Sequence, residues 1–219
     1  MFKILTSAAD ALALVAVVLV LFLLPFVHAA DDSMTYIEYR VLAPSIKPGT
    51  FEGAVRKLWR YTDSYARVEE VPNPQTGIHG LLISNAPNSY LINRYNNVAQ
   101  HIVDSGPTFN VIVPVFPSER SPQFKGLQMG RELAFLTSNG ATEGSDETID
   151  GVSYRVFVLK LEDSEIKLLL DKRTKQPRQL SIRNPRVQYA LRYDAYRTDV
   201  PVDLTLFSVP QDVRIIRAN

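Results

Sequence analysis

The sequence lacks cysteine, and only two histidines, His79 and His101, follow its first thirty residues. Without cysteine the chain forms no disulfide and has no attachment point for the lipid of a bacterial lipoprotein. The common zinc sites built from Cys and His also lack their ligands. We therefore expect a fold held together by its apolar core, with no bound metal or cofactor and no lipid anchor.

An excess of charge of either sign is also missing, because 24 Lys and Arg stand against 23 Asp and Glu. Nucleic-acid binding draws on a surplus of basic residues, so we expect no nucleic-acid partner. The sequence contains no G-x-G-x-x-G motif, no phosphate-binding P-loop and no G-x-S-x-G nucleophile motif. These absences favour a protein that is not an enzyme.

The remaining acid–base candidates are few. Adjacent carboxylates at expected strand ends or in loops, where solvated charge is typical, include Glu69-Glu70, Asp146-Glu147 and Glu162-Asp163. His79 and His101 each fall inside an expected strand. An enzymatic function stays open as an alternative, and a histidine buried beside a carboxylate would favour it.

The N-terminus has the pattern of a secretory signal. Lys3 precedes an apolar block over residues 11–27, and small residues follow it at 29 and 30. The block is slightly short of the ~20 residues that a membrane-spanning helix needs, although an uncleaved anchor remains the rival interpretation. We expect residues 1–29 to be a cleaved signal peptide and residues 30–219 to be a single domain in the periplasm.

The rest of the chain is rich in short strand patterns separated by turn residues. In 51–61, Phe51, Gly53, Val55, Trp59 and Tyr61 share one phase of the alternation, which predicts that this phase is buried. The expected strands are 35–43, 51–61, 64–71, 78–84, 89–95, 98–104, 151–161, 165–171, 178–184 and 187–198.

The middle of the chain has a different character. Four prolines in 105–122 argue against a regular central strand, and 127–140 has helical spacing with a C-cap at Asn139 and Gly140. A sheet of this many strands must curl or close. The sequence therefore predicts a mainly β (α+β) fold, with a curled antiparallel sheet covered by a few helices.

The stretch 168–216 resembles the closing half of the outer-membrane lipoprotein-sorting family, whose type members are LolA and LolB. The resemblance rests on Asp171 at a strand end, Pro177, the Tyr-x-x-Asp-x-Pro pattern of 196–201, Leu206-Phe207 and Pro210. Segments 51–60 and 78–109 also resemble an exported branch of this LolA-like group. The similarity thus covers most of the chain after the signal.

The resemblance implies an incomplete, half-open β-barrel with helices as a lid over an apolar cavity. Residues 204–207 would form a short helical plug, and 213–216 would add the final strand. The cavity of this family holds the acyl chains of lipids or lipoproteins, and each buried methylene contributes ~0.8 kcal/mol. The expected partners are therefore acyl chains, with envelope proteins as further possible partners.

Two sets of candidate site residues follow. The cavity candidates are the apolar residues Phe51, Val55, Trp59, Ile83, Leu91, Phe157, Leu168, Leu180, Tyr189 and Leu191. The candidates for contact with a head group or a partner protein are Lys172, Arg173, Lys175 and Arg178. The alternative function on the same fold is a protein-interaction or envelope-stress sensor module, for which the basic turn and the proline-rich segment would be the contact surface.

Overall fold

The computed structural model describes residues 33–47, 49–106, 111–115, 122–185 and 188–217. The chain divides into two units, residues 1–32 and 33–219, and the description below concerns the second. The expected signal peptide lies outside the described residues and stays a prediction. No helix in the described ranges is both long and apolar enough to cross a membrane.

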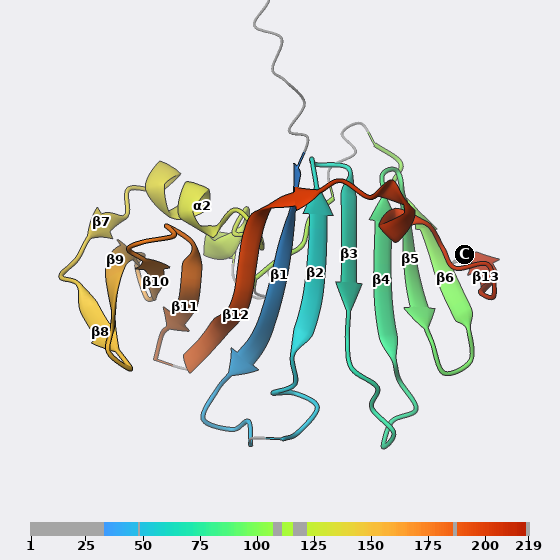
Figure 1. The fold of residues 1–219 in the computed structure, drawn as a ribbon, viewed down its shortest axis with the longest axis horizontal. Coiled ribbons are helices and arrows are strands. Elements are labelled where there is room, and N and C mark those ends of the chain that lie inside the picture. Colours follow the sequence, from blue (N-terminus) through green and yellow to red (C-terminus); the bar gives the residue numbers. More distant parts are fainter. Residues whose placement is uncertain (1–32, 48, 107–110, 116–121, 186–187, 218–219) are drawn as a thin grey trace, which may run out of the picture. The chain divides into compact units, whose positions relative to one another are not determined.

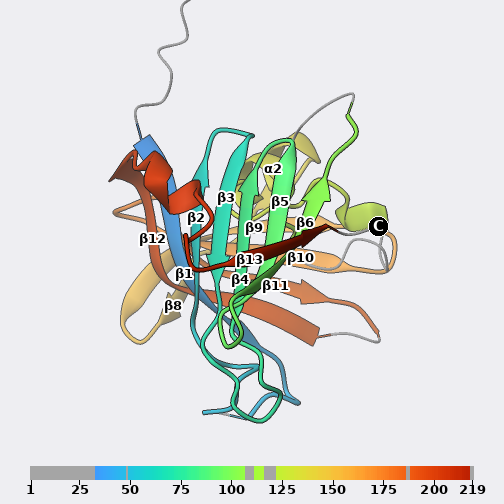
Figure 2. The same ribbon diagram turned by 90° about the vertical axis from the view of Figure 1, so that its right-hand side faces the viewer.

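The described residues form one curled sheet of 13 strands (Figure 1; Figure 2). The strands are β1 (Ser33–Leu42), β2 (Arg56–Tyr61), β3 (Tyr65–Glu69), β4 (Gly80–Asn85), β5 (Asn88–Asn93), β6 (Val98–Val103), β7 (Thr142–Glu143), β8 (Glu147–Ile149), β9 (Val152–Lys160), β10 (Glu165–Asp171), β11 (Pro177–Arg183), β12 (Gln188–Pro201) and β13 (Arg214–Arg217). This architecture confirms the predicted mainly β, half-open sheet.

The sheet consists of two antiparallel series joined in the middle. Strands β2 to β6 pair in sequence order, and β9 to β12 do the same. Strand β1 lies between them, paired with β2 on one side and with β12 on the other. Strand β13 pairs in parallel with β6 at one end, and β7 lies at the other end. No described pairing joins the two ends, so the sheet stays open.

The main core lies on one face of the sheet, which we call the inner face. Residues from distant strands meet there, including Leu58 of β2, Leu168 of β10 and Leu180 of β11, all at 0% exposure. Because these strands are far apart in the sheet order, the sheet must curl around this face to bring them together. Burial of such side chains is the main stabilising contribution.

The core is covered by a segment that we call the lid, whose described residues are 111–115 and 122–138 and which consists of irregular chain and one helix. Val113 and Val115 are buried, and the amide of Met129 donates to the carbonyl of Val113 at 2.9 Å. The lid continues through the 3-10 turn η2 (Pro122–Phe124) into the helix α2 (Glu132–Ser138), which contacts β9 and β11. The sequence predicted a few helices, and the described residues contain one α-helix and two short 3-10 turns.

The helix is shorter than the predicted span 127–140. Gly130 has φ +83°, a backbone conformation that interrupts a right-handed helix, so α2 begins only at Glu132. Leu127 and Met129 are buried from the irregular segment that precedes α2. The C-terminal end agrees with the prediction, with Asn139 as the C-cap residue and Gly140 at φ +82°.

The opposite, outer face carries the end of the chain. The 3-10 turn η3 (Leu204–Phe207) confirms the expected helical plug, and the Asp203 side chain accepts from the amide of Thr205 at 3.0 Å. Phe207 is 1% exposed and lies 5.4 Å from the ring of Tyr65. Strand β13 then follows at the predicted place.

Two details of the expected strand 51–61 are wrong. Phe51 to Ala54 form a turn, and the strand begins at Arg56. The buried phase is also the other one, because Leu58 and Arg60 are at 0% and 5% exposure while Trp59 is only partly buried. Arg60 is a charged residue in the buried phase of this strand. It is buried because its guanidinium donates to the carbonyl of Met129 in the lid at 3.0 Å.

Candidate functional site: an apolar trough on the inner face

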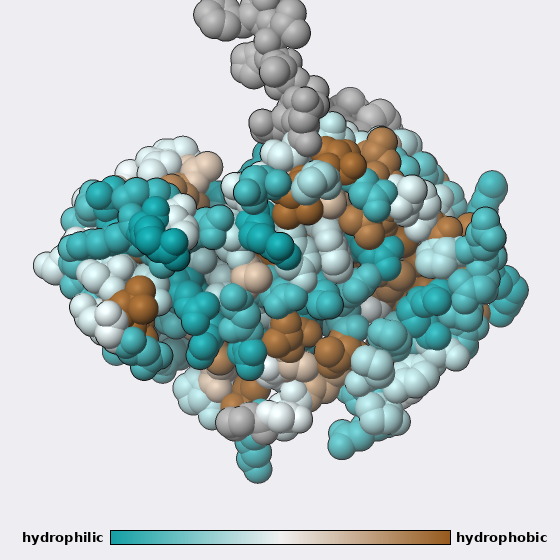
Figure 3. All heavy atoms as spheres, in the orientation of Figure 1, coloured by the Kyte–Doolittle hydropathy of each residue, from teal (hydrophilic) through white to brown (hydrophobic). Residues whose placement is uncertain are grey.

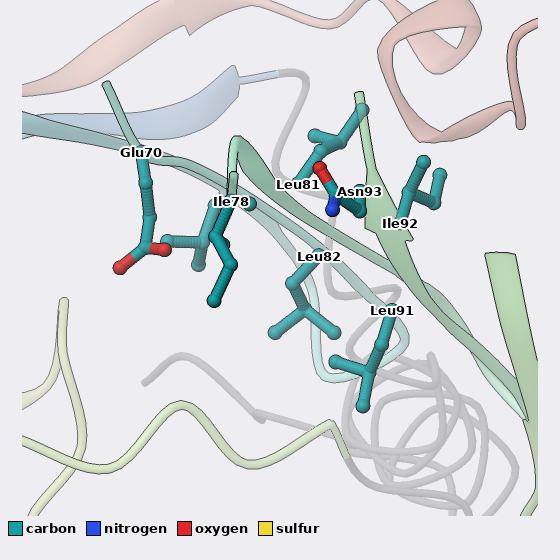
Figure 4. Close-up of a pocket in the computed structure, with 9 residues that line it drawn as sticks. Glu70, Ile78, Leu81, Leu82, Leu91, Ile92 and Asn93 are labelled. Carbon is teal, nitrogen blue, oxygen red and sulfur yellow. The ribbon is translucent and has the colours of Figure 1, made fainter. Parts of the chain in front are cut away.

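An apolar trough of about 460 Å³ lies on strands β3 to β5, beyond the edge of the lid. In Figure 4, Ile78, Leu82 and Leu91 project to one side of β4 and β5, whereas Leu81 and Ile92 project to the other side. The lining residues are Val68, Glu70, Ile78, Gly80, Leu81, Leu82, Leu91, Ile92 and Asn93. This volume falls within the range of ~300–1,000 Å³ that is typical of small-ligand pockets.

The strand register explains why apolar side chains meet in the trough. Val68, Leu82 and Leu91 are direct neighbours across β3, β4 and β5, so their side chains stand in one row on the same face. The row continues through Leu58 and Ile37, which are completely buried under the lid. The trough is therefore an extension of the core that the lid does not cover.

The exposed fractions of the inner-face side chains show which part of this face the lid leaves open. Leu91 is 47% exposed and Ile78 is 46% exposed, whereas Leu58 in the same face is 0% exposed. Val68 belongs to both regions, since it lines the trough and packs against the main core. Continuous exposed apolar surface of this kind is typical of binding sites.

One end of the trough is polar. The Glu70 carboxylate accepts from Nε of Arg56 at 3.0 Å. Asn93 is engaged with the backbone, because its Nδ2 donates to the carbonyl of Gly77 at 2.9 Å and its Oδ1 accepts from the amide of His79 at 3.1 Å. Asn93 therefore holds the chain around β4 and β5 in place, and Glu70 is the charged group that a ligand would meet.

In the view of Figure 3, which shows the side of the molecule with the C-terminal segment, apolar side chains form separate patches among polar ones. The outer-face apolar cluster of Leu81, Ile83, Ile92 and Ala99 is covered by Val209 and Val213 of the C-terminal segment. The end of the chain thus closes this part of the outer face.

The predicted cavity residues do not share one surface. Leu168, Leu180 and Leu191 are completely buried in the main core, with Phe157 and Tyr189 packed against it. Ile83 belongs to the outer-face cluster. Trp59 lies on the outer face beside Tyr36, with ring centroids 5.0 Å apart.

The other members of that set lie elsewhere again. Phe51 and Val55 flank the turn that precedes β2, where Arg56 stacks over the Phe51 ring at 5.2 Å. Leu91 alone of the ten lines the trough. Whether any of the ten contacts a ligand stays a prediction.

Sequence reasoning missed Val68, Ile78 and Leu82. A signal for Leu82 existed in the three consecutive apolar residues 81–83, because a strand that is apolar in both phases needs cover on both faces. Leu81 and Ile83 are buried on the outer face, which leaves Leu82 for the inner face. The missing information was that the lid stops before it reaches Leu82.

The basic turn has structural roles. Lys172 pairs with Asp146, and Arg178 donates to the carbonyl of Tyr193 at 2.7 Å. The Asp171 side chain accepts from the amides of Arg173 and Thr174, each at 2.8 Å, and these bonds hold the pKa of Asp171 below its usual value. Lys175, with φ +61°, completes the turn. A role of this turn in binding stays a prediction.

Neither histidine lies beside a carboxylate among the described residues. His101 stacks on Tyr90 with a centroid distance of 4.6 Å, and its Nε2 is 2.8 Å from Oδ1 of Asn88. The ring of His79 meets that of Tyr95 edge-on at 6.1 Å. No group of three metal-ligating side chains occurs in these residues either.

Among the described residues, the most deeply buried charge-bearing group is Glu132, at 0% exposure at the start of α2. Tyr193 donates to its Oε1 at 2.9 Å, Tyr196 donates to its Oε2 at 3.0 Å, and the amide of Gly130 donates to Oε1 at 3.0 Å. Desolvation raises the pKa of Glu132. This cluster fixes the lid helix to β12.

The chain matches no protein-family model and no curated protein. Among solved structures it is similar to an uncharacterised conserved protein from Thermus thermophilus, with 7% identity and a TM-score of 0.52 over 85% of this chain and 91% of that one. At such identity a structural likeness concerns the fold alone. The likeness shows that the fold is shared with a solved structure.

Two weaker likenesses are to named proteins. One is the MucA/MucB complex of Pseudomonas aeruginosa, with 12% identity and a TM-score of 0.43 over 85% of this chain and 59% of that one. The other is a LolA superfamily protein from Nitrosomonas europaea, with 11% identity and a TM-score of 0.34 over 82% and 91% of the two chains. Membership of this chain in the LolA family stays a prediction.

Proposed function

We propose that this protein binds the acyl chain of a lipid or lipoprotein in the inner-face trough and carries it in the periplasm. The observation that supports the proposal is the row of Val68, Leu82 and Leu91, which extends the apolar core into solvent. Each methylene that leaves water contributes ~0.8 kcal/mol, so a chain of ten methylenes in the trough would contribute roughly 8 kcal/mol before ordering costs.

The packed core restricts where the chain lies. Leu168, Leu180 and Leu191 are completely buried beneath the lid, so the space between lid and sheet is filled with side chains. An acyl chain would therefore lie along the open trough and cover Ile78 and Leu91, which are 46% and 47% exposed in the structure. This placement differs from a cavity enclosed by the lid, which the family resemblance implies.

The first test is binding of an uncharged apolar fluorophore, N-phenyl-1-naphthylamine, to the purified protein. Leu91→Asp places a charge in the trough, and we expect it to weaken binding about tenfold, equal to ~1.4 kcal/mol. Leu204→Asp is the matched control, because Leu204 is 52% exposed on the opposite face. Equal affinity of both variants and the parent protein would contradict the proposed site.

The second test is mass spectrometry of lipid extracted from protein purified without detergent. Acyl lipid is expected in the parent protein and depleted in Leu91→Asp. Lipid-free protein that also fails to bind the fluorophore would overturn the proposal.

A protein-interaction module is the second candidate, and one observation favours it. Strand β13 is at the end of the sheet with Ile215 and Ile216 at 48% and 45% exposure, and such an edge can accept an extended segment of a partner. The test is to purify the lipid-free protein and to look for an envelope protein that co-purifies with it in a fixed stoichiometry. Such a partner would support this function instead, provided that the Ile215→Pro variant no longer binds it.

A further inference from the structure

We propose that Glu70 selects the head group of the ligand, so that the trough favours an amphiphile with an ammonium head over one with a carboxylate head. The inference rests on the proposed function, since it names the ligand class of the same trough. Glu70 is the one ionisable residue among the nine described residues that line the trough.

The partner of Glu70 is directed away from the ligand. Arg56 donates from Nε to Oε1 of Glu70, while its Nη1 donates to the carbonyls of Glu52 at 3.1 Å and Ala54 at 3.3 Å. The Arg56 side chain is 13% exposed and that of Glu70 is 32% exposed. A head group at this end of the trough would therefore meet the carboxylate before the guanidinium.

Gly80 makes room for the carboxylate. A Cβ atom at position 80 would clash with Oε2 of Glu70. The amide of Glu70 also donates to the carbonyl of Gly80 at 3.0 Å, which keeps the two residues side by side. The carboxylate thus lies across β4 on the trough side because residue 80 has no side chain.

The second carboxylate oxygen of Glu70, Oε2, has no hydrogen-bond donor in the described part of the chain, whereas Oε1 accepts from Arg56. An ammonium head placed beside Oε2 would gain a charge-assisted hydrogen bond. A carboxylate head in the same place would meet a like charge next to an apolar wall, where screening by water is reduced.

The experiment is displacement of N-phenyl-1-naphthylamine by three ligands with the same tail: dodecylammonium, dodecanoate and dodecanol, each below its micelle concentration at pH 7. For the parent protein we expect half-displacement by dodecylammonium at a concentration at least tenfold lower than by dodecanoate. Dodecanol measures the contribution of the tail without a charge. Glu70→Gln is expected to reduce the ratio between the two charged ligands to less than threefold.

Two further variants separate the role of Glu70 from general effects of charge. Glu69→Gln is the matched control, since Glu69 is the next residue and also pairs with an arginine, Arg67, but on the outer face at 2.6 Å. It should keep the full preference. Gly80→Ala retains the carboxylate but displaces it, and it should lower the preference as Glu70→Gln does.

The outcomes distinguish the two proposals. Displacement by dodecanol with no preference between the charged ligands, or a preference that survives in Glu70→Gln, would overturn the role of Glu70 and leave the acyl-chain trough supported. A fluorophore that does not bind, or that none of the three ligands displaces, would overturn both.

Discussion

Leu180 of β11 and Leu91 of β5 both point to the inner face of the same sheet, yet the first is 0% exposed and the second 47%. The difference lies in their cover. The region of β9 to β12 is closed by α2 and the irregular lid, whereas β4 and β5 lie beyond the lid. One curled sheet thus contains a region that serves stability and a region whose apolar face is left for a ligand.

The two regions also differ in how polar groups are used. Under the lid, the Glu132 carboxylate accepts three hydrogen bonds and has no contact with solvent. In the trough, the Glu70 side chain is 32% exposed and accepts one hydrogen bond, from Arg56, among the described residues. A satisfied buried carboxylate fixes structure, while a partly satisfied carboxylate at the edge of an apolar surface is suited to recognition.

The largest expected effect comes from truncating one leucine in each region. Leu180→Ala should lower the free energy of unfolding by about 3 kcal/mol, because it opens a cavity in the packed core. Leu91→Ala should lower it by about 0.5 kcal/mol or less, because the side chain is already half exposed. Urea denaturation followed by tyrosine and tryptophan fluorescence measures both. Similar losses would show that the trough is as closely packed as the lidded region.

A smaller effect is expected from Tyr193→Phe. The change removes the hydroxyl that donates to Oε1 of Glu132 and leaves the buried carboxylate with one donor fewer. We expect a loss of about 1–2 kcal/mol in the free energy of unfolding. Tyr65→Phe is the control, since no hydrogen bond of its hydroxyl occurs among the described residues, and its unfolding free energy should not change. A neutral Tyr193→Phe would show that the cluster does not anchor the lid.

The pH dependence of stability tests the same cluster. Burial raises the pKa of Glu132 above its value in the unfolded chain, so the native protein keeps the proton to higher pH. The resulting stabilisation is complete below the unfolded pKa of ~4.3 and is lost as the pH rises through the folded pKa. Glu132→Gln cannot titrate, so the stability of the parent relative to this variant should fall between pH 4 and pH 8. A constant difference across that range would contradict the raised pKa.

The smallest effect is expected at the basic turn, which joins β10 to β11 and lies far from the trough strands β3 to β5 in the sheet order. Lys172→Ala removes an exposed ion pair with Asp146, and such pairs contribute ~0–1 kcal/mol. We expect a change in unfolding free energy below ~0.5 kcal/mol and unchanged fluorophore binding. Weaker binding to vesicles of anionic phospholipid in this variant would instead support the predicted head-group role of the turn.

Much of the fold could be predicted from the sequence because the strand patterns are local. The turns around Asn85, Asn96 and Gly140 and the short helical 204–207 segment all fall where their residues indicate. The face of β2 could not be predicted in the same way. Arg60 is buried because the lid carbonyls of Met129 and Val111 accept its N–H groups, and these partners lie 69 and 51 positions away in the sequence.

The candidate site was harder to predict for a related reason. Apolar residues at Leu82 and Leu91 resemble those at Leu168 and Leu180 in the sequence, and only the extent of the lid distinguishes them. The lid helix α2 contacts β9 and β11, on the side of the sheet where Leu168 and Leu180 lie. The pattern of apolar residues in a sequence predicts which side chains favour burial. It does not predict which of them the lid buries in the folded protein.

The position of β1 has a consequence for how the chain reaches its native state. Strands β2 to β6 and β9 to β12 can each assemble from hairpins between neighbours, but Arg40 of β1 bonds Asp194 of β12 across 154 residues of sequence. Closing so long a loop is entropically costly and slows folding. Synthesis must therefore reach β12 before the two hairpin series can join, and until then the side of β1 that pairs with β12 stays open to pairing with other chains.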